Sequence, residues 1–158
     1  MDDSINIKIS SEVVKEVAGR RVRLAHGDIF TDDCVIEPGQ SLQFVSAGKK
    51  EHLGVAKVAG VERIGYRDVW VTLESPPGKL AVGDLAYLRP ATEAVVSGCA
   101  FRSQLKTALL IRPPSRITDC AYADIAYGVH AFINDSIEGP PPFGLRISRC
   151  VFERPSVA

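Results

Sequence analysis

Three segments of the sequence carry the same pattern around a cysteine. They read Val95-Val96-Ser97-Gly98-Cys99-Ala100-Phe101, Arg116-Ile117-Thr118-Asp119-Cys120-Ala121-Tyr122 and Arg146-Ile147-Ser148-Arg149-Cys150-Val151-Phe152. Each has Val or Ile three positions before the cysteine, Ser or Thr two before it, and an aromatic residue two after it. The copies are spaced by 21 and 30 residues. A period of about 20 residues with short β-type segments is typical of a parallel β-solenoid, in which each turn stacks on the next.

Stacking of the copies predicts ladders of like residues on the inward face. The ladders are Val96/Ile117/Ile147, Cys99/Cys120/Cys150 and Phe101/Tyr122/Phe152. A second apolar segment follows the first two copies, and at the 21-residue offset His130 takes the position of Leu109. The cysteines then act as small buried apolar residues rather than ligands or nucleophiles, and without a C-x-x-C pair we expect no metal site. The alternative is that these segments are unrelated hairpin strands of a β-sandwich.

Residues 1–90 lack this period but carry short β-type runs between turn signals. The runs are Ile5–Ile9, Arg21–Ala25, Ser41–Ser46, Leu53–Val61, Asp68–Glu74 and Leu85–Arg89. Residues 11–18 are open to either a helix or a strand, because three of them are the β-branched residue valine. We expect an all-β chain, with a small antiparallel β-barrel (or a sandwich) over residues 1–90. A short right-handed parallel β-helix of two to three coils follows over residues 91–158.

Composition excludes several functional classes. The 158 residues are 46% hydrophobic with 19 basic and 19 acidic side chains, which is unlike a disordered chain and unlike a nucleic-acid-binding protein. No apolar run approaches the ~18 residues of a membrane span, and no nucleotide, nucleophilic-serine or cofactor motif is present. We therefore expect no membrane, nucleic acid or cofactor. The acidic start Met1–Ser4 shows no signal peptide, which predicts a cytoplasmic location, or export if the chain is part of a longer protein.

The combination resembles one family. The segments Val82-Gly83-Asp84-Leu85, Val96–Phe101, Leu109–Ile111, and Glu138-Gly139 leading into Leu145–Phe152, are similar to the later part of the parallel β-helix glycoside hydrolases that act as α-1,3-galactosidases. The resemblance covers about residues 12–153, and family members are several times longer. It implies a β-helix interrupted by an inserted barrel, and an activity on carbohydrate.

Glycoside hydrolysis needs two carboxyl groups that flank the scissile bond. Asp135 and Glu138 lie in a proline-rich segment between the second and third copies, and we expect them to form the acid/base pair; the alternative is two solvated loop carboxylates. His130, Tyr127 and Arg102 are candidates for substrate binding through rings and directed hydrogen bonds, although ordinary wall or surface roles also explain them.

Another acidic stretch follows His26, with Asp28, Asp32 and Asp33. A turn-rich acidic loop explains it without a metal.

The sequence thus favours a carbohydrate-active β-helix module, either a fragment or a degenerate homologue of such a hydrolase. The alternative is a non-catalytic structural or interaction domain that oligomerises through its β-helix. Because a solenoid of so few coils leaves apolar ends uncovered, we expect a homo-oligomer in either case.

Overall fold

The computed structural model describes residues 3–7, 9, 11–27, 35–49, 51–90, 92–102, 107–131 and 144–153. These residues form fifteen β-strands and no helix, so the all-β prediction is confirmed. The chain divides into two compact units. We call the unit within Ile9–Arg89 the barrel unit. The β-helix unit combines the strand that precedes Ile9 with the residues that follow Arg89.

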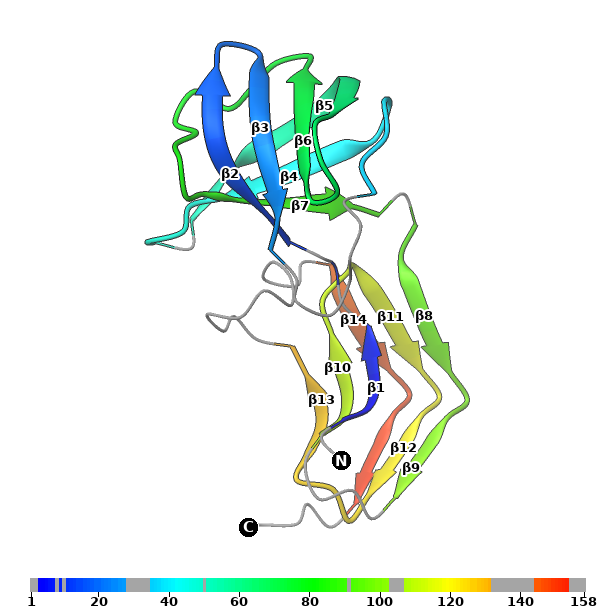
Figure 1. Cartoon of the computed structure of the whole chain (residues 1–158). Coiled ribbons are helices and arrows are strands. Elements are labelled where there is room, and N and C mark those ends of the chain that lie inside the picture. Colours follow the sequence, from blue (N-terminus) through cyan, green and yellow to red (C-terminus); the bar gives the residue numbers. More distant parts are fainter. Residues whose placement is uncertain are drawn as a thin grey trace. The chain divides into compact units, whose positions relative to one another are not determined.

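The barrel unit is a closed ring of six antiparallel strands in the order β2-β3-β6-β5-β4-β7 (Figure 1). The strands are β2 (Ser11–Ala18), β3 (Arg21–His26), β4 (Ser41–Val45), β5 (His52–Arg63), β6 (Asp68–Leu73) and β7 (Leu85–Arg89). β2 pairs with β3 on one side and β7 on the other, which closes the ring. Residues 11–18, for which the sequence allowed either a helix or a strand, therefore form a strand, as their β-branched valines favour.

Alternation along the strands fills the barrel. Val22 and Leu24 of β3, and Val69 and Val71 of β6, are fully or almost fully buried in one apolar cluster, while the residues between them lie nearer the surface. This period of two is what a sheet with one covered face requires. A barrel, rather than a sandwich, is the fold of this unit.

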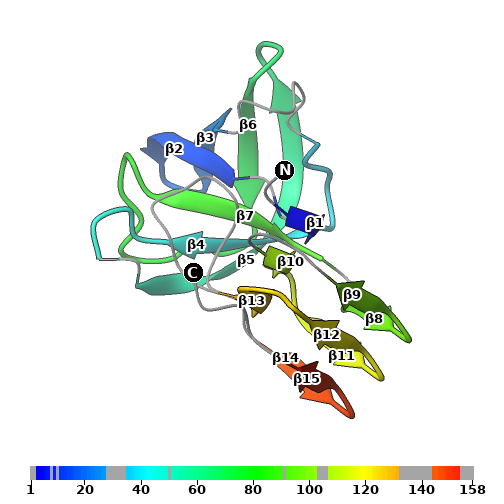
Figure 2. The ribbon, with the colours of Figure 1, turned by 90° about the horizontal axis from the view of Figure 1, so that it is seen from below.

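The β-helix unit consists of three parallel three-stranded sheets. Its strands are β1 (Asp3–Ile7), β8 (Ala94–Ser97), β9 (Ala100–Arg102), β10 (Thr107–Ile111), β11 (Ser115–Thr118), β12 (Ala121–Ala123), β13 (Tyr127–His130), β14 (Leu145–Ser148) and β15 (Val151–Glu153). The first coil contains β8, β9 and β10, the second β11, β12 and β13, and the third β14 and β15; Figure 2 shows these coils side by side. β1 pairs in parallel with β10, on the side away from β13.

The predicted ladders are confirmed by the strand register. Ile117 pairs with Val96 on one side and Ile147 on the other. Tyr122 lies between Phe101 and Phe152, with ring centroids 5.1 and 4.7 Å away and interplanar angles of 7° and 5°. Similar side chains at the same position of successive coils therefore stack into continuous apolar and aromatic columns, as a solenoid requires. We call the strands of one coil a rung.

One residue bends each coil just before its cysteine. Gly98, Asp119 and Arg149 have φ values of 67°, 56° and 52°. Left-handed backbone is open to glycine and tolerated by Asp, but it is unfavourable for Arg. The repeated left-handed residue turns the chain from the sheet of β8, β11 and β14 into the sheet of β9, β12 and β15.

The expected position of His130 is wrong by one residue. β10 and β13 align Leu109 with Val129 and Leu110 with His130, an offset of 20 residues instead of 21. The second coil has one residue fewer between its cysteine bend and its third strand, so the repeat offset does not extend to that sheet. Val129, not His130, joins the apolar cluster with Leu109.

Candidate functional site

Two of the expected sugar-binding residues come together on β13. The rings of Tyr127 and His130 are stacked, with centroids 5.4 Å apart and an angle of 19° between the planes. Tyr127 is 58% exposed. The pair therefore forms a partly exposed aromatic platform.

The other expected site residues are not brought to this platform by the described structure. Arg102 is on β9, in another sheet, and its register partner is Ala123. Asp135 and Glu138 lie outside the described residues. Their pairing, and the use of Arg102 with Tyr127 and His130, stay predictions.

A hollow of about 290 Å³ opens beside the same strand. Its lining consists of Tyr122, Ile125, Ala126, Gly128, Phe152 and Glu153. It combines aromatic side chains with one carboxylate, and Ala126 and Gly128 flank Tyr127 in the chain. Sequence reasoning missed this hollow, because Gly128, which admits the Phe152 ring, lies outside the repeated segments.

Gly128 sets the shape of the hollow. A Cβ atom at this position would lie 2.7 Å from Cε1 and 3.0 Å from Cδ1 of Phe152, and 3.3 Å from Cδ1 of Tyr122. Such distances are shorter than van der Waals contact, so the Phe152 ring packs directly on the glycine backbone. Only glycine allows this approach without moving the ring.

The Tyr122 hydroxyl is buried, and the structure gives it no hydrogen-bond partner among the residues that it describes. Burial raises the pKa of Tyr122 well above its ordinary value, and the neighbouring Cys120 thiol adds to the shift. The phenol therefore stays neutral at physiological pH. An unpaired buried hydroxyl costs stability, and it is the one polar feature of this otherwise apolar column.

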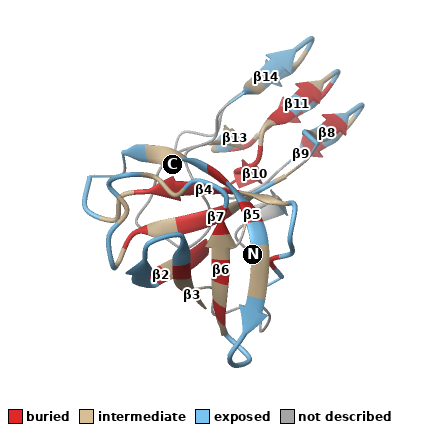
Figure 3. Ribbon diagram, turned by 90° about the horizontal axis from the view of Figure 1, so that it is seen from above, coloured by how far each residue is buried: buried red, intermediate tan, exposed pale blue. Residues whose placement is uncertain are grey.

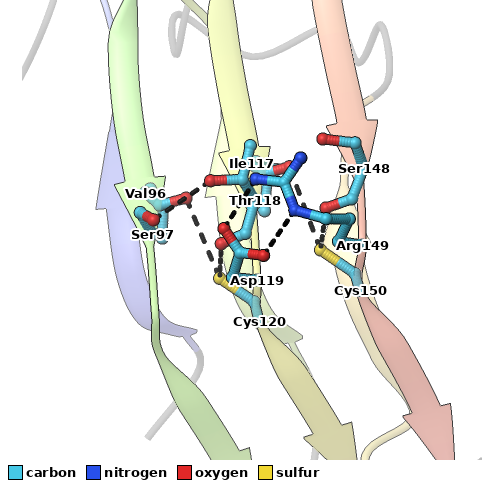
Figure 4. A network of polar contacts seen from close by, with 9 residues as sticks. All are labelled: Val96, Ser97, Ile117, Thr118, Asp119, Cys120, Ser148, Arg149 and Cys150. Carbon is cyan, nitrogen blue, oxygen red and sulfur yellow. Dashed lines mark hydrogen bonds and ion pairs between the residues drawn. The ribbon is translucent and has the colours of Figure 1, made fainter.

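Side chains at the coil bends form a polar network (Figure 4). Arg149 donates two hydrogen bonds to Asp119, at 2.6 Å from Nε and 2.8 Å from Nη2, and Thr118 Oγ1 donates to Ser97 Oγ at 3.0 Å. The guanidinium holds the pKa of Asp119 below its usual 3.8, chiefly through these hydrogen bonds. Both side chains are solvent-exposed, so the network links neighbouring coils and offers no enclosed site for chemistry.

The three cysteines of the ladder make the same hydrogen bond. The thiols of Cys99, Cys120 and Cys150 each donate to the carbonyl two residues earlier, at 3.5, 3.2 and 3.4 Å. Figure 4 shows the contacts of Cys120 and Cys150. All three thiols are free. This arrangement agrees with their expected role as small core residues.

Two further polar contacts bear on the expected residues. Arg116 pairs in register with Arg146 of the next coil, and Glu93 Oε1 lies 3.4 Å from Arg116 Nε, so a carboxylate lies beside these neighbouring arginines. In the barrel, His26 Nδ1 and Glu12 Oε1 are 2.8 Å apart and both side chains are buried. His26 thus has a structural partner that sequence reasoning missed, because β2 was not assigned; Asp28, Asp32 and Asp33 lie outside the described residues.

Among the described residues, no group of His, Cys, Asp and Glu side chains could hold a metal ion. In the same part of the chain, no helix has the length and apolar character needed to span a membrane. Comparison with protein-family models and with curated proteins finds no match. The candidate site therefore has to be judged on its geometry.

Proposed function

We propose that the chain is a carbohydrate-active β-helix module related to the parallel β-helix glycoside hydrolases that act as α-1,3-galactosidases. One observation carries the proposal: an exposed Tyr127 ring stacks on His130, and the chain neighbours of Tyr127 line a hollow together with aromatic residues and Glu153.

This surface suits a sugar ring. The C–H face of a pyranose is apolar and packs on an aromatic face, while its hydroxyl groups need directed hydrogen bonds from polar side chains. The hollow is at the lower limit of small-ligand sites, which are about 300–1,000 Å³, and so accepts one sugar residue rather than a long segment. Tyr127 supplies the stacking face, and His130 and Glu153 supply polar atoms.

Catalysis is assigned to the segment that follows β13. Asp135 and Glu138 come five and eight residues after His130 in the sequence. We assign one carboxyl group to protonation of the leaving oxygen and the other to activation of water or to attack on the sugar. Loops on a rigid β scaffold are a common location for such groups.

The test is hydrolysis of an α-linked galactose disaccharide by the wild-type chain and its variants. We expect Asp135→Asn and Glu138→Gln each to lower kcat by at least about 100-fold while the disaccharide still binds, since general acid–base catalysis is worth about 10²–10⁴-fold. Lys15→Gln, an exposed change in the barrel, serves as the control. Unchanged kcat in both carboxylate variants, or no hydrolysis by the wild type, would refute the catalytic assignment.

The second candidate is a non-catalytic interaction domain that oligomerises through the β-helix. The observation that favours it is the exposed apolar surface of the third coil, where Ile147 and Phe152 face solvent. The same assay separates the candidates, because a purely structural domain neither binds nor cleaves the disaccharide.

A further inference from the structure

The third coil differs from the first two in the exposure of its ladder residues. Ile117 is 0% exposed and Ile147 is 44% exposed; Tyr122 is 2% exposed and Phe152 is 55% exposed. Figure 3 shows the change from β11, with buried positions, to β14. Since each rung of a solenoid buries the apolar side chains of the one before, β14 and β15 form a rung that no other described strand covers.

The backbone of this rung is also available for pairing. Within the described chain, β14 pairs only with β11, and β15 pairs only with β12. The outer edges of both strands therefore present N–H and C=O groups that can accept further strands. Exposed apolar side chains and an open strand edge occur on the same surface.

We propose that this rung binds the same rung of a second copy of the chain, about a two-fold axis through the bend at Arg149 and Cys150. An axis that bisects the bend exchanges β14 with β15 and keeps inward side chains inward. β14 then runs antiparallel to the partner's β15, and β15 to the partner's β14. A two-fold interface of this kind is closed and self-complementary.

The sequence of the rung fits this symmetry. When Ile147 lies opposite the partner's Phe152, Arg146 lies opposite the partner's Glu153 and Ser148 opposite the partner's Val151. Ile147 and Phe152 share the inward face with the other ladder residues, whereas Arg146 and Glu153 are exposed. Side chains directly opposite one another in an antiparallel pair lie about 4.5–5.5 Å apart, close enough for an ion pair. The interface thus contains two apolar contacts and two ion pairs.

Head-to-tail stacking fits less well. Its acceptor would be the first coil, but Val96 and Phe101 there are each only 7% exposed. Among the described Val/Ile and aromatic ladder residues, the exposed ones belong to the third coil, and this favours a face-to-face pair of third coils over an open filament.

The test is a charge exchange read by sedimentation equilibrium of the full chain. We expect the wild type to be a dimer. The dissociation constant should be at least about tenfold higher for Arg146→Glu and for Glu153→Arg, because each substitution alters both ion pairs of the interface. The double variant Arg146→Glu/Glu153→Arg should recover the wild-type dissociation constant. Lys15→Glu makes the same charge change as Arg146→Glu, but on the barrel, and should leave the dimer intact. Circular dichroism of each variant verifies that it is folded.

The outcomes separate the two proposals. This inference gives the interaction candidate its partner. It shares Phe152 and Glu153 with the lining of the proposed sugar site, so the dimer and a bound sugar would compete for these side chains. A monomeric wild type at 100 μM would overturn it and would leave the carbohydrate proposal untouched. A wild-type dimer that either single variant leaves unchanged, or that the double variant fails to restore, would show that this register is wrong.

Discussion

Gly128 shows how a single residue shapes the candidate site. Its missing side chain lets Phe152 lie on the backbone of β13 and continue the stack begun by Phe101 and Tyr122. The aromatic ladder could be predicted from the repeat, because the same residue type recurs at one offset. The need for glycine could not, because it depends on which strand faces the ring.

We expect Gly128→Ala to lower the free energy of unfolding by about 1–3 kcal/mol, the usual cost of forcing extra volume into a packed region. Gly78→Ala is the control, since a Cβ there meets nothing within 4 Å. Urea denaturation at fixed protein concentration gives both values. In a Phe152→Ala background the cost should largely disappear; a cost that persists would show that the ring does not cause it.

The Asp119–Arg149 pair makes a pH-dependent contribution to stability. Because the folded state lowers the pKa of Asp119, its contribution is complete above the unfolded value near 3.8 and is lost as pH falls through the folded value. We expect a carboxyl NMR titration to place Asp119 below 3.8, and Arg149→Gln to return it toward 3.8. An Asp119 pKa equal in the two proteins would contradict the bidentate pair.

At the scale of the strand, the repeat explains the two sheets on either side of the cysteine but not the third. Ladder positions follow from the pattern because the spacing within each copy is constant. His130 lies opposite Leu110 rather than Leu109, since the connection to β13 is shorter and its length is not part of the pattern. β1 pairs with a strand about 100 residues away in the sequence, and no local signal specifies that pairing.

The same substitution at one ladder position should lower the free energy of unfolding by different amounts in different coils. Ile117→Ala removes a fully buried side chain between two neighbours, so we expect a loss of about 2–5 kcal/mol. Ile147→Ala occupies the same position in the exposed rung and should cost less than about 1 kcal/mol when measured below the concentration at which the chain associates. Urea denaturation of both variants tests this. Equal costs would mean that the third coil is covered.

At the scale of the whole molecule, the two units are both β-structure but are specified differently. Short β-type runs between turn signals predicted β3 to β7 of the barrel and left β2 open, and the cysteine repeat predicted the coils. The function is less fully specified, because the aromatic platform is on β13 and the expected carboxylates lie in a segment without ladder positions. A repeat determines which side chains stack, whereas a loop that leaves the coil is set by its own contacts.

The most direct test of carbohydrate recognition is a calorimetric titration of the wild-type chain with an α-linked galactose disaccharide, beside Tyr127→Ala and the Lys15→Gln control. We expect saturable binding by the wild type and the control, and affinity at least about tenfold weaker for Tyr127→Ala, equivalent to about 1.4 kcal/mol of lost ring contact. Crystals soaked with the same sugar should show it against Tyr127. No binding by the wild type, or equal affinity in all three proteins, would contradict the assignment of the β13 surface as a sugar site.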